Sequence, residues 1–165
     1  MLVPRVRFRQ STSTGKGQAM AIVLVVYHSD TGKTRQMAEL VAAGASSVEG
    51  VSVELASADG LDINRIVECD GVALGSPDYF SYVAGQMKIV FDRLLSHKDE
   101  LKGKPFVGFG SHGGGAKVLG VIETLAGRVG LSRLREGVLC LNAPVGEAMD
   151  ECRELGKALA QAVIK

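Results

Sequence analysis

AIVLVVYHSDTGKT, residues 21–34, contains the unit of structure that the rest of the chain repeats. Its first half, 21–27, is an apolar run rich in β-branched residues and without polar alternation. Such a run is typical of a strand buried on both faces of a parallel sheet. After Thr34 the apolar residues recur at three- and four-residue spacing, which predicts an amphipathic helix. These residues are Met37, Leu40, Val41 and Ala45.

The same alternation of apolar strand and amphipathic helix continues to the end of the chain. Strands are predicted at 51–55, 70–75, 105–110 and 137–141, with a turn and a short helical piece at 56–69. Helical stripes are predicted over 87–95, 118–129 and 149–163. This order predicts an α/β fold. Its five strands favour a doubly wound parallel sheet of order 2-1-3-4-5, with helices on both faces.

A doubly wound sheet binds its ligands at the carboxyl ends of the strands, where the strand order reverses. In the predicted order this point lies between the first and third strands. The loops that can carry chemistry are therefore 28–34, 76–84 and 111–116.

The first loop has two competing interpretations. Its ending, Gly32-Lys33-Thr34, matches the end of a nucleoside-triphosphate P-loop. That motif needs a glycine five residues before Gly32, where this chain has Tyr27. A site for a single phosphate fits better, with hydroxyl donors from Ser29, Thr31 and Thr34 and with the first amides of the following helix. A purely structural alternative is that Ser29, Asp30 or Thr31 caps that helix.

The second and third loops offer groups that suit a flat ring. Three of the chain's eight aromatic residues fall within four positions, at Tyr79, Phe80 and Tyr82, immediately after Pro77 and Asp78. Exposed aromatics beside a phosphate loop can flank a ring, although packing into the core is the alternative.

The third loop reads Gly110-Ser-His-Gly-Gly-Gly-Ala116. Its glycines let backbone amides approach a ligand closely. His112 is either a general acid/base or a solvent-facing turn residue.

Composition and charge exclude several classes of protein. Residues 1–19 hold four basic side chains and no acid, so residues 20–165 carry a net charge of about −3. No basic patch predicts nucleic-acid binding, and no apolar stretch is long enough to predict a membrane span. The three cysteines are Cys69, Cys140 and Cys152, which lack metal-ligand spacing. They favour a reducing, cytoplasmic location and predict no metal site.

The chain is predicted to divide into two segments. Residues 1–19 are predicted to be a disordered basic tail or a non-native extension, with a basic arm that touches a partner as the alternative. Residues 20–165 form one domain.

Two motifs resemble the flavodoxin-like proteins. The loop Ser29-x-Thr31-Gly32-x-Thr34 looks like the FMN-phosphate loop of flavodoxins. The segment 75–93, GSPDYFSYVAGQMKIVFDR, is similar to the strand-3 signature of flavodoxin-like NAD(P)H:quinone reductases and FMN reductases. The resemblance covers residues 21–164 and implies a flavodoxin-like fold with noncovalent FMN.

The resemblance also implies a set of cofactor-binding residues. Those expected on the phosphate are Ser29, Asp30, Thr31, Gly32, Lys33 and Thr34. Those expected near the isoalloxazine ring are Pro77, Asp78, Tyr79 and Phe80, together with Ser111, His112, Gly113 and Gly114. Ser76 is also expected to bind the cofactor. No residue is expected to act as a covalent catalyst, because the cofactor carries the redox chemistry.

The resemblance leaves two kinds of partner open. An electron carrier would exchange electrons with a redox partner protein, whereas a reductase would use NAD(P)H and a quinone-like small-molecule acceptor. A third possibility is a flavodoxin-fold interaction module without redox activity. A homo-oligomer is compatible with each.

Overall fold

The computed structural model describes residues 19–164. The predicted tail therefore lies, apart from residue 19, outside the described residues. The strands are β1 (Ala21–Tyr27), β2 (Val51–Ser57), β3 (Gly71–Pro77), β4 (Pro105–His112), β5 (Ser132–Arg133) and β6 (Val138–Leu141). The helices are α1 (Lys33–Ser46), α2 (Asn64–Glu68), α3 (Gly85–Leu94), α4 (Lys98–Leu101), α5 (Val118–Arg128) and α6 (Glu147–Val163), and a 3-10 turn spans Leu95–His97.

The strands form one parallel sheet of order β2-β1-β3-β4-β5, which confirms the predicted fold class and strand order. The fifth position differs from the prediction of a single strand, because β5 and β6 share it. β5 pairs with the start of β4, and β6 pairs with its end. Between them, the backbone at Gly137 passes so close to the Gly108 carbonyl that a Cβ there would lie 2.2 Å from the oxygen.

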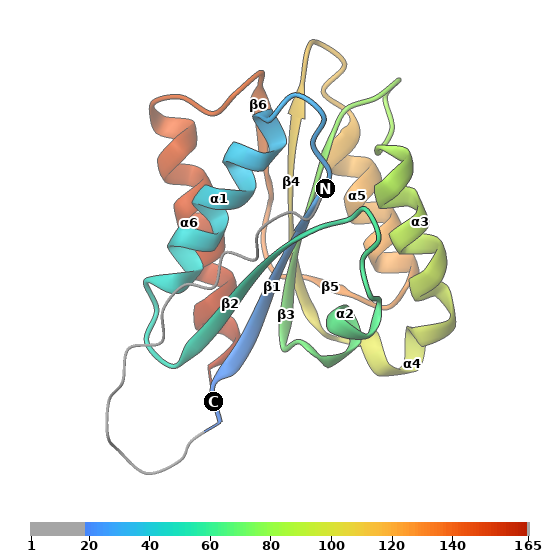
Figure 1. The fold of residues 1–165 in the computed structure, drawn as a ribbon, viewed down its shortest axis with the longest axis vertical. Coiled ribbons are helices and arrows are strands. Elements are labelled where there is room, and N and C mark those ends of the chain that lie inside the picture. Colours follow the sequence, from blue (N-terminus) through green and yellow to red (C-terminus); the bar gives the residue numbers. More distant parts are fainter. Residues whose placement is uncertain (1–18, 165) are drawn as a thin grey trace.

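Helices cover both faces of the sheet, as Figure 1 shows. α1 and α6 pack on one face, and α3 and α5 pack on the other. The residues of β1 alternate between these two layers: Val23 and Val25 join the α1/α6 core, and Leu24 and Val26 join the α3/α5 core. Because both faces are buried, the strand has no polar alternation, which explains the continuous apolar run.

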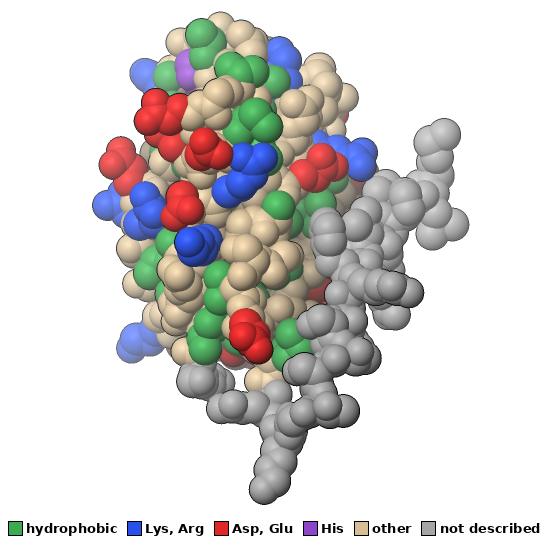
Figure 2. Space-filling model, turned by 90° about the vertical axis from the view of Figure 1, so that its left-hand side faces the viewer, with side chains coloured by type: hydrophobic (Ala, Val, Ile, Leu, Met, Phe, Trp, Pro, Cys, Tyr) green, Lys and Arg blue, Asp and Glu red, His purple; other side chains and the backbone are tan. Residues whose placement is uncertain are grey.

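The surface over α1 and α6 carries acidic and basic side chains interspersed, as Figure 2 shows. Within residues 19–164, no helix is long and apolar enough to cross a membrane. Over the same residues, no group of three or more histidine, cysteine or acidic side chains is arranged to hold a metal ion. Cys69, Cys140 and Cys152 are free and buried.

Candidate functional site: a cleft at the carboxyl edge of the sheet

Three loops meet at the carboxyl edge of the sheet, at the upper end of the view in Figure 1. They follow β1, β3 and β4 and enclose a cleft of about 220 Å³. The position of this cleft is the one that the doubly wound topology predicts. The lining residues, all of them candidates from the sequence, are Ser29, Asp30, Thr31, Lys33, Thr34, Pro77, Asp78, Tyr79, Ser111, His112 and Gly113.

The first loop leaves the N-terminal amides of α1 available to a ligand. Gly32 precedes the helix in a left-handed conformation (φ 90°), which favours glycine. The Gln36 amide donates to the Gly32 carbonyl at 3.0 Å, so the amides of Lys33, Thr34 and Arg35 come before the first helical hydrogen bond. The N-cap residue is Gly32, which has no side chain to accept hydrogen bonds from these amides.

The alternative of a simple helix cap does not match this geometry. Ser29 Oγ accepts the Gly32 amide at 3.1 Å, which shapes the loop and leaves the helix amides unused. The free amides and the positive end of the helix dipole therefore form a site for an anion.

Thr34 and Ser111 join the first and third loops. Thr34 is 1% exposed, and its Oγ1 lies 2.8 Å from Ser111 Oγ, a hydrogen bond in which either hydroxyl can donate. Both residues also line the cleft. A pair of hydroxyls can turn its donors toward a ligand without leaving a buried charge.

Asp78 fastens the second loop to the third loop. Its Oδ2 accepts the amides of Lys117 (2.8 Å) and Val118 (3.0 Å) at the start of α5, and its Oδ1 accepts the Ser81 amide (2.8 Å). The Asp78 side chain therefore caps the N-terminus of α5 from the loop after β3. Both oxygens of its carboxylate accept hydrogen bonds from backbone amides of the protein.

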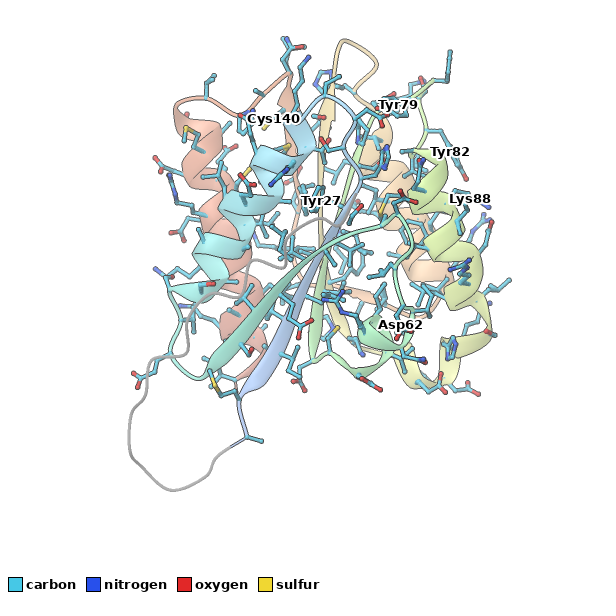
Figure 3. The ribbon with its side chains drawn as sticks, viewed as in Figure 1. Tyr27, Asp62, Tyr79, Tyr82, Lys88 and Cys140 are labelled. Atoms are coloured by element: carbon cyan, nitrogen blue, oxygen red, sulfur yellow. The ribbon has the colours of Figure 1, made fainter. Side chains whose placement is uncertain are left out.

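Residues Tyr79 to Tyr82 form a tight turn closed by two backbone hydrogen bonds of 3.0 Å between Tyr79 and Tyr82. Phe80 (φ 55°) and Ser81 (φ 63°) both adopt the left-handed conformation that such a turn demands. Neither is glycine, so the turn is strained. Tyr79 and Tyr82 lie at the upper end of the molecule in Figure 3, and Phe80 is fully exposed.

The Asp30 carboxylate lies between two rings. Oδ2 accepts the Tyr79 hydroxyl at 2.5 Å, and Oδ1 lies 3.2 Å from His28 Nε2. The hydrogen bond from Tyr79, followed by the contact with His28, holds the pKa of the Asp30 carboxyl below its ordinary value. Partial burial and the Asp30 carboxylate raise the pKa of the Tyr79 phenol to about 12.

Lys33 and His112 complete the lining. Lys33 Nζ donates to Asn142 Oδ1 at 3.2 Å, so the lysine spans from the first loop to the segment after β6. His112 carries a buried Nδ1 that has no hydrogen-bond partner. An unpaired buried polar atom is costly, and a polar ligand in the cleft can remove that cost.

Four sequence candidates lie outside the lining of the cleft. Ser76 is fully buried, and its hydroxyl donates to the Pro77 carbonyl and accepts the Ala84 amide, both at 2.9 Å. It supports the second loop from behind. The side chain of Phe80 points to solvent, and Gly32 and Gly114 lack side chains that could reach the cleft.

Two neighbours of the cleft were missed from the sequence. His28 opens the first loop but is not among its predicted site residues, yet it contacts Asp30 and packs edge-on to Tyr79. Asn142 follows β6, in a loop that holds none of the predicted site residues. Its position at a carboxyl end of the sheet was the available signal.

The donors fit a phosphate attached to a larger planar group. The cleft is lined by neutral hydroxyls, one lysine, an aromatic ring and a histidine, and the free amides of α1 lie in the same loop as the hydroxyls. The fold and the cleft thus define a mononucleotide-binding protein of the doubly wound α/β class.

Comparisons with known proteins identify the family. A family model described as Flavodoxin matches residues 25–156. A flavodoxin from Aquifex aeolicus (strain VF5) is 34% identical over 163 residues, covering 86% of each chain. A coenzyme F420H(2) oxidase from Methanothermobacter marburgensis is 32% identical over 90% of this chain, which corresponds to 38% of that protein. The structure of a flavodoxin from the domain Archaea superposes with a TM-score of 0.79 at 25% identity, covering 86% of this chain and 98% of that one.

The chain belongs to the flavodoxin family. This confirms the resemblance drawn from the two sequence motifs. FMN is the cofactor of the family, which confirms the predicted cofactor, and the chain is an FMN-binding electron-transfer protein.

Proposed function

We propose that the chain is an electron carrier that holds FMN in this cleft. It exchanges electrons with a partner protein that docks on the exposed aromatic side chains Phe80 and Tyr82 beside the cleft. The observation that carries the proposal is Phe80, a large apolar side chain held fully in solvent by a strained turn beside the cleft. Strain of this kind persists where the surrounding structure enforces it, commonly at functional sites. Tyr82 is also exposed in the same turn, and together the two rings give a partner an apolar contact.

The size of the cleft supports exchange at a surface. Sites that enclose a drug-sized ligand typically measure roughly 300–1,000 Å³. At about 220 Å³ this cleft is smaller, so part of a molecule as large as FMN would remain accessible to a partner. The Aquifex flavodoxin, which matches over 86% of both chains, supports the same function.

Within this proposal, each loop has its own task. Ser29, Thr31 and Thr34 bind the phosphate with hydroxyls, aided by the first amides of α1. Pro77 and Tyr79 border one side of the ring, and the backbone of 111–114 borders the other. Bound FMN supplies the redox chemistry, and the chain binds it, orients it and shields it from water.

A reductase that uses NAD(P)H is the second candidate. Segment 75–93 resembles the quinone and FMN reductases, and the third loop presents almost no side chains. Nothing lies within 4 Å of a Cβ built at Gly113, which lines the cleft, so there is open space beside the backbone there. This space leaves room for a planar nicotinamide or quinone.

Anaerobic mixing separates the two candidates. Holo-protein is mixed with NADPH or NADH alone, and in a second arm a flavoprotein reductase that delivers single electrons is added. We expect bleaching of the flavin absorbance only when the reductase protein is present. Rapid bleaching by a nicotinamide alone would contradict the carrier function and favour the enzyme.

The extent of the domain and the cellular location are also proposals. The FMN-binding domain is proposed to extend over residues 20–165. Three free, buried thiols support a cytoplasmic, reducing location.

A further inference from the structure

Asp30 places a negative charge in the loop that is proposed to bind a phosphate. A carboxylate near a phosphate is repelled by it, and this one is well exposed, with 60% of its side chain accessible. Asp30 does not cap α1, because the N-cap residue is Gly32 and its amide pairs with Ser29 Oγ. The carboxylate therefore needs another explanation.

Asp30 contacts Tyr79 directly, and it also contacts His28, which packs against Tyr79. One carboxylate oxygen accepts the Tyr79 hydroxyl at 2.5 Å, and the other lies 3.2 Å from His28 Nε2. The rings of His28 and Tyr79 meet edge-on, with centroids 6.4 Å apart and planes at 76°. His28 is 7% exposed, and its Nε2 makes no aligned hydrogen bond, so the ring acts as a buried wall for its two neighbours.

These contacts fix the orientation of the Tyr79 ring. Its backbone is held by the bridge to Tyr82, its edge is packed against His28, and its hydroxyl is anchored on Asp30. Tyr79 also lines the cleft. Without the anchor, a tyrosine at a loop tip rotates between rotamers and loses entropy when a ligand orders it.

We propose that Asp30 is a positioning residue that acts on FMN through Tyr79, by holding the tyrosine ring as a pre-formed wall for the flavin. The inference rests on the proposed placement of the flavin between the second and third loops. It assigns to a residue of the phosphate loop an effect on the opposite end of the cofactor.

The competing explanation predicts the opposite sign. If Asp30 were only a negative charge beside the phosphate, its removal would tighten FMN binding. If Asp30 positions Tyr79, its removal weakens binding by the same factor as removal of the Tyr79 hydroxyl. The two residues then act as one unit, and their effects do not add.

The experiment compares Asp30→Ala, Asp30→Asn, Tyr79→Phe and the double variant Asp30→Ala/Tyr79→Phe. Glu49→Ala is the matched control, because it removes one exposed acid in the loop before β2, at the opposite edge of the sheet. FMN affinity is measured by quenching of flavin fluorescence in the apo-protein. Near-ultraviolet circular dichroism of tyrosine in the apo-protein gives a readout that does not involve FMN.

We expect Asp30→Ala and Tyr79→Phe each to weaken FMN about ten-fold, which corresponds to about 1.4 kcal/mol. The double variant should bind no more weakly than the weaker single variant. Asp30→Asn keeps an acceptor for the Tyr79 hydroxyl and should stay within about three-fold of the wild type. The tyrosine dichroism should fall in Asp30→Ala and persist in Asp30→Asn.

Three outcomes would overturn the inference: tighter FMN binding by Asp30→Ala, effects that multiply in the double variant, or an Asp30→Asn variant as weak as Asp30→Ala. A wild-type protein that leaves FMN fluorescence unquenched would instead remove the proposed function. The tyrosine dichroism of the apo-protein would still test the Asp30 anchor in that case.

Discussion

The loop after β1 and the loop after β3 border the same cleft, yet they use their hydrogen bonds in opposite ways. The first loop leaves the amides of α1 unpaired and gathers hydroxyls around them. In the second loop the polar groups are already hydrogen-bonded to other parts of the protein, through Asp78 and the Tyr79–Tyr82 bridge. The same loop exposes aromatic rings to solvent. Under the proposed function, the first loop supplies binding free energy for the cofactor, while the second supplies shape and a contact for other molecules.

The largest effect is expected in the first loop. Thr34→Val keeps the buried volume but removes the hydroxyl that contacts Ser111 and is proposed to donate to the phosphate. It should therefore weaken FMN by about 1.5–3 kcal/mol, the cost of a lost hydrogen bond to a charged group. Thr124→Val on the exposed face of α5 is the matched control. Fluorescence titration gives both affinities. Equal affinity in Thr34→Val and wild type would move the phosphate away from this loop.

The next largest effect is expected in the second loop, on the free energy of unfolding. Asp78→Ala removes the cap of α5 and the acceptor of the Ser81 amide, so the free energy of unfolding should fall by about 1–2 kcal/mol. Asp62→Ala, which removes one acceptor from the short helix α2, is the control and should cost less. Urea denaturation of the apo-proteins measures both. Equal losses would mean that Asp78 does not hold the loops together.

A smaller effect of opposite sign is expected at the tip of the turn. Phe80→Asn places a residue that tolerates φ > 0 in the strained position and should raise the free energy of unfolding by about 0.5–1 kcal/mol. Because the aromatic contact is lost, electron exchange with a protein partner should slow several-fold while FMN affinity stays constant. Stopped-flow kinetics and FMN titration test this pair of results. An unchanged rate would show that Phe80 is not part of the docking surface.

The smallest expected effect is a pH dependence of the stability that the Asp30–Tyr79 contact between the two loops provides. The pKa of the Asp30 carboxyl is lowered in the folded protein, so its interactions stabilise the fold above the ordinary aspartate pKa and are lost as the pH falls through the folded value. The advantage of wild type over Asp30→Asn in unfolding free energy should therefore shrink between pH 5 and pH 3. Denaturation at several pH values measures it. A constant difference would contradict the assignment.

Much of the fold could be predicted because local pattern and global topology agree. The run 21–27 and the helical stripes gave the element order, and parallel topology then placed the three loops together. The division of the fifth strand was missed because the two residues of β5 are too few to show a pattern. Its pairing depends on the neighbouring strand.

The cleft was predicted in outline, but not the way its side chains are used. Asp78 is a residue type that often binds ligands, and its position in a cleft loop predicts that role. In the structure it caps α5 instead, and that role depends on Lys117, which lies 39 residues away in the sequence. Ser76 likewise looks available in the sequence, whereas in the structure it is buried near the end of β3, a strand whose two faces are both covered. The Asp30–Tyr79 contact joins residues 49 apart, so no local pattern reveals it.

The most direct test of the division between the loops is to titrate apo-protein with FMN and with riboflavin, which lacks the phosphate. If the hydroxyls and amides of the first loop hold the phosphate, FMN should bind at least about 100-fold more tightly than riboflavin, because two or more hydrogen bonds to a charged group are lost. Thr34→Val should narrow this ratio, and Phe80→Asn should leave it unchanged. Equal affinities for FMN and riboflavin would contradict the account.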